Sequence, residues 1–149
     1  MRTLSVEDDF TSRLLLQELL KPYGPTHVAV NGQEAVYAVR AGMDAGDPYD
    51  LVCLDIMMPE MDGHQACKEI RAVEEERGIL SSDGVKIVMT TALGDTKNSF
   101  AAFWNLCDGY LVKPIHKAML LEGLRKLGLP RSGSGDVMKS RQAGSQAGR

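Results

Sequence analysis

At residues 51–55 the chain reads LVCLD, four apolar residues that run directly into a carboxylate. A short apolar run of this kind is typical of a strand buried on both faces of a parallel sheet. In an open α/β sheet, ligands bind outside the carboxyl ends of the strands. Three further runs have the same form: TLSV at 3–6 leads into Glu7-Asp8-Asp9, VKIVM at 85–89 into Thr90-Thr91, and YLV at 110–112 into Lys113-Pro114.

Segments with the periodicity of amphipathic helices lie between these apolar runs. This alternation indicates βαβ units with a parallel sheet. The first helix should end near Lys21, because Pro22 disfavours helical geometry in the residue before it. Right-handed crossovers would place helices on both faces of the sheet, giving an α/β three-layer sandwich. The expected helices lie at about 10–21, 33–40, 64–77, 96–106 and 116–127, with a short second strand at 27–30 and a loop at 42–48.

Size and composition fit one soluble globular domain. The chain has 149 residues, of which 44% are hydrophobic and 25% charged, and we assign the domain to residues 1–129. Residues 130–149, rich in Gly, Ser, Gln and Ala, are expected to be disordered. No apolar run approaches the ~20 residues that span a bilayer, and the N-terminus lacks a secretion signal. We therefore expect a cytoplasmic protein without membrane contact.

Charge is unevenly distributed. The net charge is −3, but residues 130–149 hold four cationic side chains against Asp136, a net +3 that leaves −6 in the domain. An acidic domain argues against nucleic-acid binding by the folded part. Cys53, Cys67 and Cys107 lack metal-binding spacing, so we expect reduced thiols.

The acidic residues at the strand ends suggest a cation site. Adjacent acids repel one another unless they face solvent or a cation, and Glu7 and Asp8 can reach one edge because the strand ends there. Asp9 suits a helix N-cap. A carboxylate at Asp55, after a buried strand, needs a partner or a metal, and it is also a candidate nucleophile that can carry an acyl phosphate. Such oxygen ligands suit Mg²⁺.

The other two strand ends offer groups for an anion. A threonine hydroxyl can donate to a phosphoryl oxygen and the Lys113 ammonium can pair with another. The pattern alone does not decide between Thr90 and Thr91. Glu60 and Asp62, in the loop bounded by Pro59 and Gly63, are interpreted as solvated.

Together these residues resemble the receiver domain of two-component response regulators, over about residues 2–128. The resemblance implies a flavodoxin-like fold with five helices and a five-stranded parallel sheet of order 2-1-3-4-5. Its motifs are VEDD at 6–9, DIMMP at 55–59 with MDG at 61–63, TA at 91–92, and DGYLVKP at 108–114.

The resemblance also implies the acceptor and the metal ligands. Asp55 would accept the phosphoryl group. Mg²⁺ (or Mn²⁺) would be bound directly by Asp8 and Asp55, through water by Glu7, and by the backbone carbonyl of Met57. Lys113 would pair with the phosphoryl group.

It further implies a switch. Thr91, and not Thr90, would be the switch hydroxyl, and Tyr110 the switch aromatic. The fourth helix, last strand and last helix would form the output face.

On this reading the protein is a stand-alone response regulator in a two-component phosphorelay, resembling chemotaxis regulators. A histidine kinase or histidine phosphotransfer protein would supply the phosphoryl group, and a downstream protein effector would receive the signal. The protein would be a signalling phosphoacceptor that assists its own phosphorylation and dephosphorylation, not an enzyme. We expect a monomer or a phosphorylation-dependent dimer.

The sequence departs from the family pattern in two ways. Ser5 lies inside a strand where the family has an aliphatic residue, and a buried hydroxyl needs a partner. Met57 and Leu93 occupy the positions that tune dephosphorylation in the family; both are apolar and cannot orient a water. We therefore predict a slowly decaying phosphoryl-aspartate.

Two other classes of protein compete with this interpretation. A phosphatase of the haloacid-dehalogenase type needs a second Asp two residues after its nucleophile, where Met57 stands. A phosphorylation-independent interaction module would lack the acidic pair or the lysine, yet all are present.

Overall fold

The computed structural model describes residues 1–58, 61–80, 83–92 and 106–130. Its strands are β1 (Thr3–Val6), β2 (Thr26–Ala29), β3 (Leu51–Asp55), β4 (Lys86–Thr91) and β5 (Gly109–Val112). Its helices are α1 (Phe10–Leu20), the 3-10 turn η1 (Lys21–Tyr23), α2 (Gly32–Asp44), α3 (Gly63–Glu76) and α5 (Lys117–Lys126).

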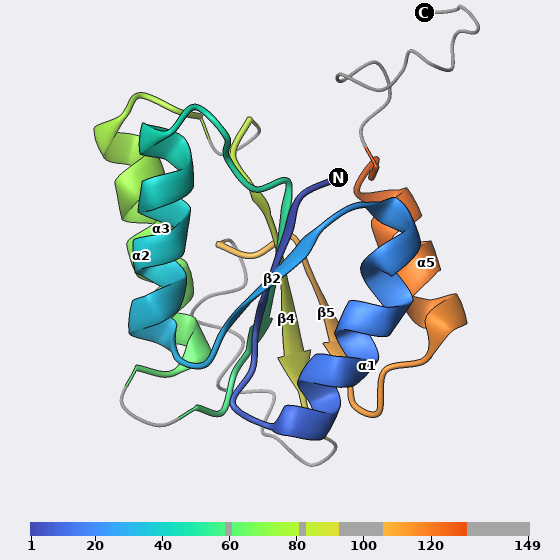
Figure 1. Cartoon of the computed structure of the whole chain (residues 1–149). Coiled ribbons are helices and arrows are strands. Elements are labelled where there is room, and N and C mark those ends of the chain that lie inside the picture. Colours follow the sequence, from blue (N-terminus) through green and yellow to red (C-terminus); the bar gives the residue numbers. More distant parts are fainter. Residues whose placement is uncertain (59–60, 81–82, 93–105, 131–149) are drawn as a thin grey trace, which may run out of the picture.

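The five strands form one parallel sheet of order β2-β1-β3-β4-β5, which confirms the predicted topology. Val6 lies beside Leu54, and Asp55 lies beside Thr90. The polar residues at the carboxyl ends of β1, β3 and β4 therefore share one edge of the sheet. Figure 1 shows this edge below the arrowhead of β4.

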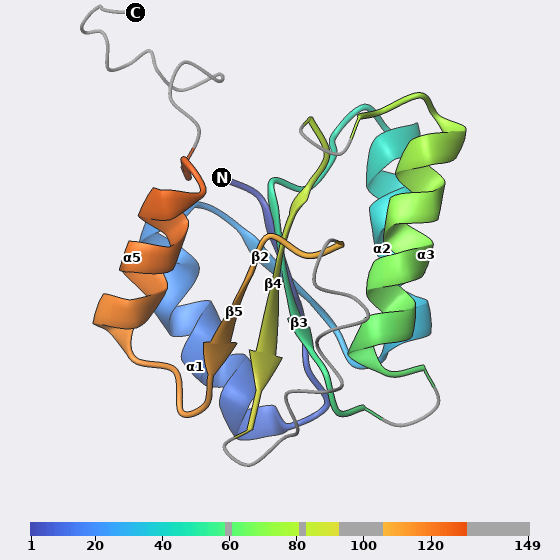
Figure 2. The same ribbon diagram turned by 180° about the vertical axis from the view of Figure 1, so that it is seen from behind.

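Helices cover both faces of the sheet, as the periodicity predicts. Helices α2 and α3 lie on one face and α1 and α5 on the other (Figures 1 and 2). Every residue of β3 is buried, because this central strand is covered on both sides. An apolar cluster lies on each face of the sheet. On one face α2 contributes Val36 and Val39 and α3 contributes Ile70 and Val73. On the other face α1 contributes Leu16 and Leu20 and α5 contributes Leu120 and Leu124.

Local signals account for most helix boundaries. The Asp9 side chain accepts a hydrogen bond from the Ser12 amide at 2.9 Å, so Asp9 is the N-cap of α1, as predicted. The prediction for α2 was wrong at its end: the helix continues through residues 41–44, which we had placed partly in a loop. Gly42 is buried inside the helix, where a Cβ would lie 3.0 Å from the Asp47 carbonyl oxygen. This glycine serves close packing and does not end the helix.

Two predictions fall outside the described residues: the helix at 96–106, apart from Leu106, and the disordered tail beyond Pro130. In the described part of the chain, no helix is long and apolar enough to cross a membrane. The cysteines are thiols, as expected, and burial raises the pKa of Cys53 to about 12. Ser5 is fully buried, and its hydroxyl has no hydrogen-bond partner among the described residues.

Candidate functional site

The ends of β1 and β3 bring three carboxylates together. Glu7, Asp8 and Asp55 each offer an oxygen within 4.8 Å of the others. Glu7 and Asp55 are buried, with 1% and 4% of their surface exposed, whereas Asp8 is exposed. The parallel register of β1 and β3 produces this convergence, because Val6 and Leu54 are partners and the next residue of each strand points to the same edge.

The residue directly after β5, Lys113, places a cation beside these carboxylates. The Lys113 ammonium lies 2.6 Å from Glu7 Oε1 and 3.4 Å from Asp55 Oδ2. The Lys113 amide donates to the Thr91 carbonyl at 2.7 Å, which continues the β4–β5 ladder one step beyond the strand. The peptide bond from Lys113 to Pro114 is cis. Residues from three strand ends that are far apart in the sequence thus meet, as the sequence predicts: Glu7 with Asp8, Asp55, and Lys113.

The backbone after Asp55 folds back closely on itself. The Met57 amide donates to Asp55 Oδ1 at 3.2 Å, and the Gly63 amide donates to the Ile56 carbonyl at 2.9 Å. A Cβ on Gly63 would collide with the Asp55 carbonyl oxygen, so this position requires glycine. Asp62, which we had interpreted as merely solvated, is the N-cap of α3 and accepts from the Gln65 amide at 2.9 Å. Glu60 lies outside the described residues.

Burial and crowding of like charges oppose ionisation of Asp55. Burial, followed by the neighbouring Glu7 carboxylate, raises the pKa of Asp55 to about 7, although Lys113 and the Met57 amide oppose the rise. Burial alone would lower the pKa of Lys113. The hydrogen bond to Glu7 and the charges of Asp55 and Glu7 outweigh that effect, so the pKa of Lys113 is raised and the side chain is an ammonium.

Arg13 was not identified from the sequence. Its Nη1 donates to the backbone carbonyls of Glu7 at 3.1 Å and Asp8 at 3.3 Å, and so holds the acidic turn that joins β1 to α1. The Asp9 amide donates to Glu7 Oε2 at 3.2 Å and fixes that carboxylate further. An arginine in a leucine-rich helix gives no sequence signal for this role, because the contact depends on how the turn folds.

The remaining predicted residues surround this cluster. Thr90 and Thr91 are both buried, and the Thr91 hydroxyl donates to the Ala92 carbonyl at 3.3 Å. Tyr110 is 46% exposed and Met57 is 65% exposed. Leu93 lies outside the described residues.

The arrangement suits a hard divalent cation. Among the described residues, Lys113 is the one cation that pairs with this group of three carboxylates, so the group carries excess negative charge when its acids are ionised. Carboxylate and carbonyl oxygens together with waters are the ligands that Mg²⁺ prefers, and the exposed Asp8 leaves the cluster open to solvent. The residues present therefore fit a magnesium ion and an incoming anion.

Comparison with known proteins agrees with this geometry. The chain is 37% identical over 126 residues to the sensor protein GacS of Pseudomonas syringae pv. syringae, an alignment that covers 84% of this chain but 13% of GacS. It is 43% identical over 90 residues to the two-component response regulator ORR41 of Oryza sativa subsp. japonica, covering 57% of this chain and 68% of that protein. The chain thus spans only a small part of GacS.

A solved structure gives the same result for the fold. The receiver domain of the histidine kinase CKI1 from Arabidopsis thaliana, crystallised with Mg²⁺ and BeF₃⁻, matches with a TM-score of 0.71 at 27% identity, covering 85% of this chain and 88% of that chain. The model of the response regulator receiver domain matches residues 3–125, which include all five strands. The chain therefore belongs to the response regulator receiver domain family.

Proposed function

We propose that this protein is a phosphoryl-accepting response regulator in a two-component phosphorelay, with Asp55 as the acceptor. The observation that carries the proposal is the convergence of Asp55, Glu7 and Lys113 at one sheet edge. The receiver family and the Mg²⁺ and BeF₃⁻ bound to the CKI1 receiver domain support it. The donor would be a phosphohistidine on a histidine kinase or a phosphotransfer protein.

The transfer is a displacement at phosphorus. A carboxylate oxygen of Asp55 attacks, an O–P bond forms, the P–N bond to histidine breaks, and its electron pair returns to the imidazole nitrogen. Asp55 must be deprotonated to attack, and Lys113 would pair with the transferred group. Such catalysis consists mainly of positioning and electrostatic stabilisation.

Mg²⁺ (or Mn²⁺), held by Asp8, Asp55 and the Met57 carbonyl, and by Glu7 through water, would neutralise charge on the phosphoryl oxygens. The chain's own residues prepare that site. Arg13 fixes the backbone that carries Glu7 and Asp8.

Phosphorylation would act as a switch. New phosphoryl oxygens would attract the Thr91 hydroxyl, and Tyr110 would move inward from its half-exposed position. Such a change shifts a two-state equilibrium, and it would alter the face formed by β5, α5 and the helix predicted at 96–106. A downstream effector protein would bind that face. On this proposal the protein is a cytoplasmic signalling phosphoacceptor, either monomeric or dimerising on phosphorylation. It does not turn over an external substrate as an enzyme does.

The phosphorylated form should decay slowly. The exposed Met57, and Leu93 at the second position that tunes dephosphorylation in the family, are apolar residue types and offer no side-chain hydrogen bond that would orient an attacking water. Loss of the phosphoryl group within seconds would contradict this expectation.

The experiment is incubation with acetyl phosphate and Mg²⁺, followed by intact-mass measurement. We expect the mass of one added phosphoryl group, its absence in Asp55→Ala, and its absence when EDTA replaces Mg²⁺. Exposed Asp47→Ala is the matched control and should be phosphorylated normally. Turnover of external phosphoesters would indicate a phosphatase, and no modification under any condition would indicate a phosphorylation-independent module.

A further inference from the structure

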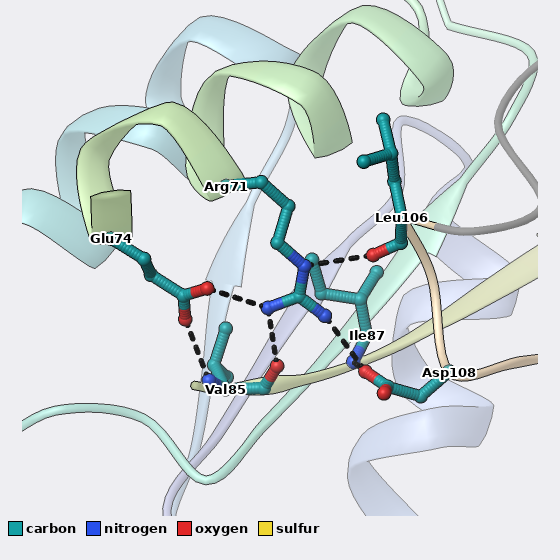
Figure 3. A network of polar contacts seen from close by, with 6 residues as sticks. All are labelled: Arg71, Glu74, Val85, Ile87, Leu106 and Asp108. Carbon is teal, nitrogen blue, oxygen red and sulfur yellow. Dashed lines mark hydrogen bonds and ion pairs between the residues drawn. The ribbon is translucent and has the colours of Figure 1, made fainter. Parts of the chain in front are cut away.

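At the opposite end of β4 and β5 from the acidic cluster, the Arg71 side chain joins α3 to the starts of both strands (Figure 3). Only 11% of this side chain is exposed. Its guanidinium donates four hydrogen bonds: Nε to the Leu106 carbonyl at 2.8 Å, Nη1 to Glu74 Oε1 at 2.7 Å and to the Val85 carbonyl at 2.9 Å, and Nη2 to Asp108 Oδ2 at 2.8 Å.

Asp108 carries this connection to the first residue of β5. Its Oδ2 accepts from the Ile87 amide at 2.8 Å as well as from Arg71, and its own amide donates to the Ile87 carbonyl at 2.7 Å. Asp108 is thus joined to one residue of β4 by both backbone and side chain, directly before Gly109. Arg71 in turn fixes the direction of the Asp108 carboxylate.

Glu74 completes the network on the α3 side. Its Oε2 accepts from the Val85 amide at 2.7 Å, and only 2% of its side chain is exposed. A Cβ on Gly84 would collide with the Glu74 carboxylate, so the chain leaves room for this buried acid. Glu74 and Asp108 share Arg71 as their cationic partner, and each also accepts a hydrogen bond from a backbone amide. Pairing together with hydrogen bonds is the condition for keeping buried charges in place. This network of short hydrogen bonds holds the first residues of β4 and β5 in a fixed position.

Strand β5 needs such an anchor. It is a four-residue strand at the edge of the described sheet and pairs with β4. A slip by one residue would displace Lys113 by about 3.3 Å and turn alternate side chains to the other face. The Lys113 ammonium would then leave its contacts with Glu7 at 2.6 Å and Asp55 at 3.4 Å.

We propose that Arg71, acting through Asp108, is a positioning residue for Lys113: it fixes the register of β5 and thereby places the ammonium in the phosphoryl site. This inference rests on the proposed function. Arg71 touches neither the acceptor nor the metal ligands. On this inference its effect on phosphorylation passes through Lys113, and that route can be tested.

The test is a double-mutant cycle. Arg71→Lys keeps the charge but loses the planar fork that makes four bonds. We expect it to slow phosphorylation by acetyl phosphate about fivefold in the wild type and less than about twofold in Lys113→Met, since residues that act through one another are non-additive. Equal losses in both backgrounds would overturn the inference. Arg77→Lys is the matched control, because Arg77 near the end of α3 pairs with exposed Asp44 at 2.7 Å. It should change neither rate.

Amide hydrogen exchange tests the same inference without phosphorylation. In Arg71→Lys we expect the Lys113 amide, which bonds to Thr91, to exchange at least about fivefold faster, while the Leu54 amide in β3 is unchanged. Unchanged Lys113 exchange, or equal acceleration of both amides, would contradict it. If Arg71→Lys does not fold, Asp108→Asn replaces it in both measurements. If the wild type accepts no phosphoryl group, the proposed function fails and the exchange result alone decides on the positioning role.

Discussion

Replacing Asp55 by asparagine should stabilise the metal-free protein, and the gain should depend on pH. The folded protein holds the pKa of Asp55 at about 7, against an ordinary value of 3.8, chiefly because the carboxyl is buried and next because Glu7 is close. Between these two values the folded state binds a proton that the unfolded chain releases. Stability of the wild type therefore falls as pH rises through this window. Asparagine keeps the shape and an oxygen acceptor for the Met57 amide, but never ionises.

The size of the effect follows from the shift. About three pH units at about 1.36 kcal/mol each set a ceiling of about 4 kcal/mol. The gain in the free energy of unfolding must be smaller than this ceiling for two reasons. The sheet edge opens to water, which screens the charges. Asparagine also loses the attraction between Lys113 and Asp55, whose charged atoms lie 3.4 Å apart. We expect a gain of about 1–2 kcal/mol above pH 8, shrinking to near zero around pH 4.

Urea unfolding in EDTA, from about pH 4 to about pH 8.5, measures this difference. Glu18→Gln is the control, since Glu18 is an exposed acid on α1 and its removal should change stability little at any pH. A stability difference between Asp55→Asn and wild type that stays constant across the range would refute the reasoning. So would a loss of stability above pH 8.

Three further predictions use the same unfolding assay. Mg²⁺ at ten times its Kd should stabilise the wild type by about 1.4 kcal/mol, and Asp8→Asn should lose most of this gain; equal stabilisation of both would remove Asp8 from the metal site. Ser5→Ala should be neutral or stabilise by up to about 1 kcal/mol, because it removes a buried hydroxyl without a partner among the described residues; a loss above 1 kcal/mol would show that the hydroxyl is satisfied. Asp62→Ala should cost about 1 kcal/mol by removing the cap of α3, whereas Asp62→Asn should cost little; equal costs would contradict the capping role.

The sheet could be predicted because each strand gives two sequence signals, an apolar run and a polar residue at its end. Runs such as LVCLD at 51–55 are apolar throughout, as a doubly covered strand requires, and each ends in a polar residue. In a parallel sheet those ends share an edge, so the sequence was enough to predict that Glu7, Asp55 and Lys113 lie close together, as they do in the structure. The strand order itself came from the family resemblance and not from periodicity.

Other features depend on contacts that no local pattern encodes. Gly42 was placed in a loop, yet α2 continues through it to Asp44, and the Asp47 carbonyl oxygen would crowd a Cβ at this position. Arg13 and Arg71 were not singled out from the sequence. Each acts by bonding to backbone carbonyls that only the folded chain brings within reach.

The two ends of β5 have complementary roles in the proposed switch. The Lys113 ammonium is shared unequally, at 2.6 Å from Glu7 and 3.4 Å from Asp55. A phosphoryl group on Asp55 would add negative charge on the more distant side and draw the ammonium away from Glu7. That pull changes side-chain contacts only if the strand itself stays in register, because a sliding strand would follow the ammonium and dissipate the change. The proposed Arg71–Asp108 anchor at the far end of β5 would meet this requirement, so that charge at the site would be converted into side-chain rearrangement around Thr91 and Tyr110.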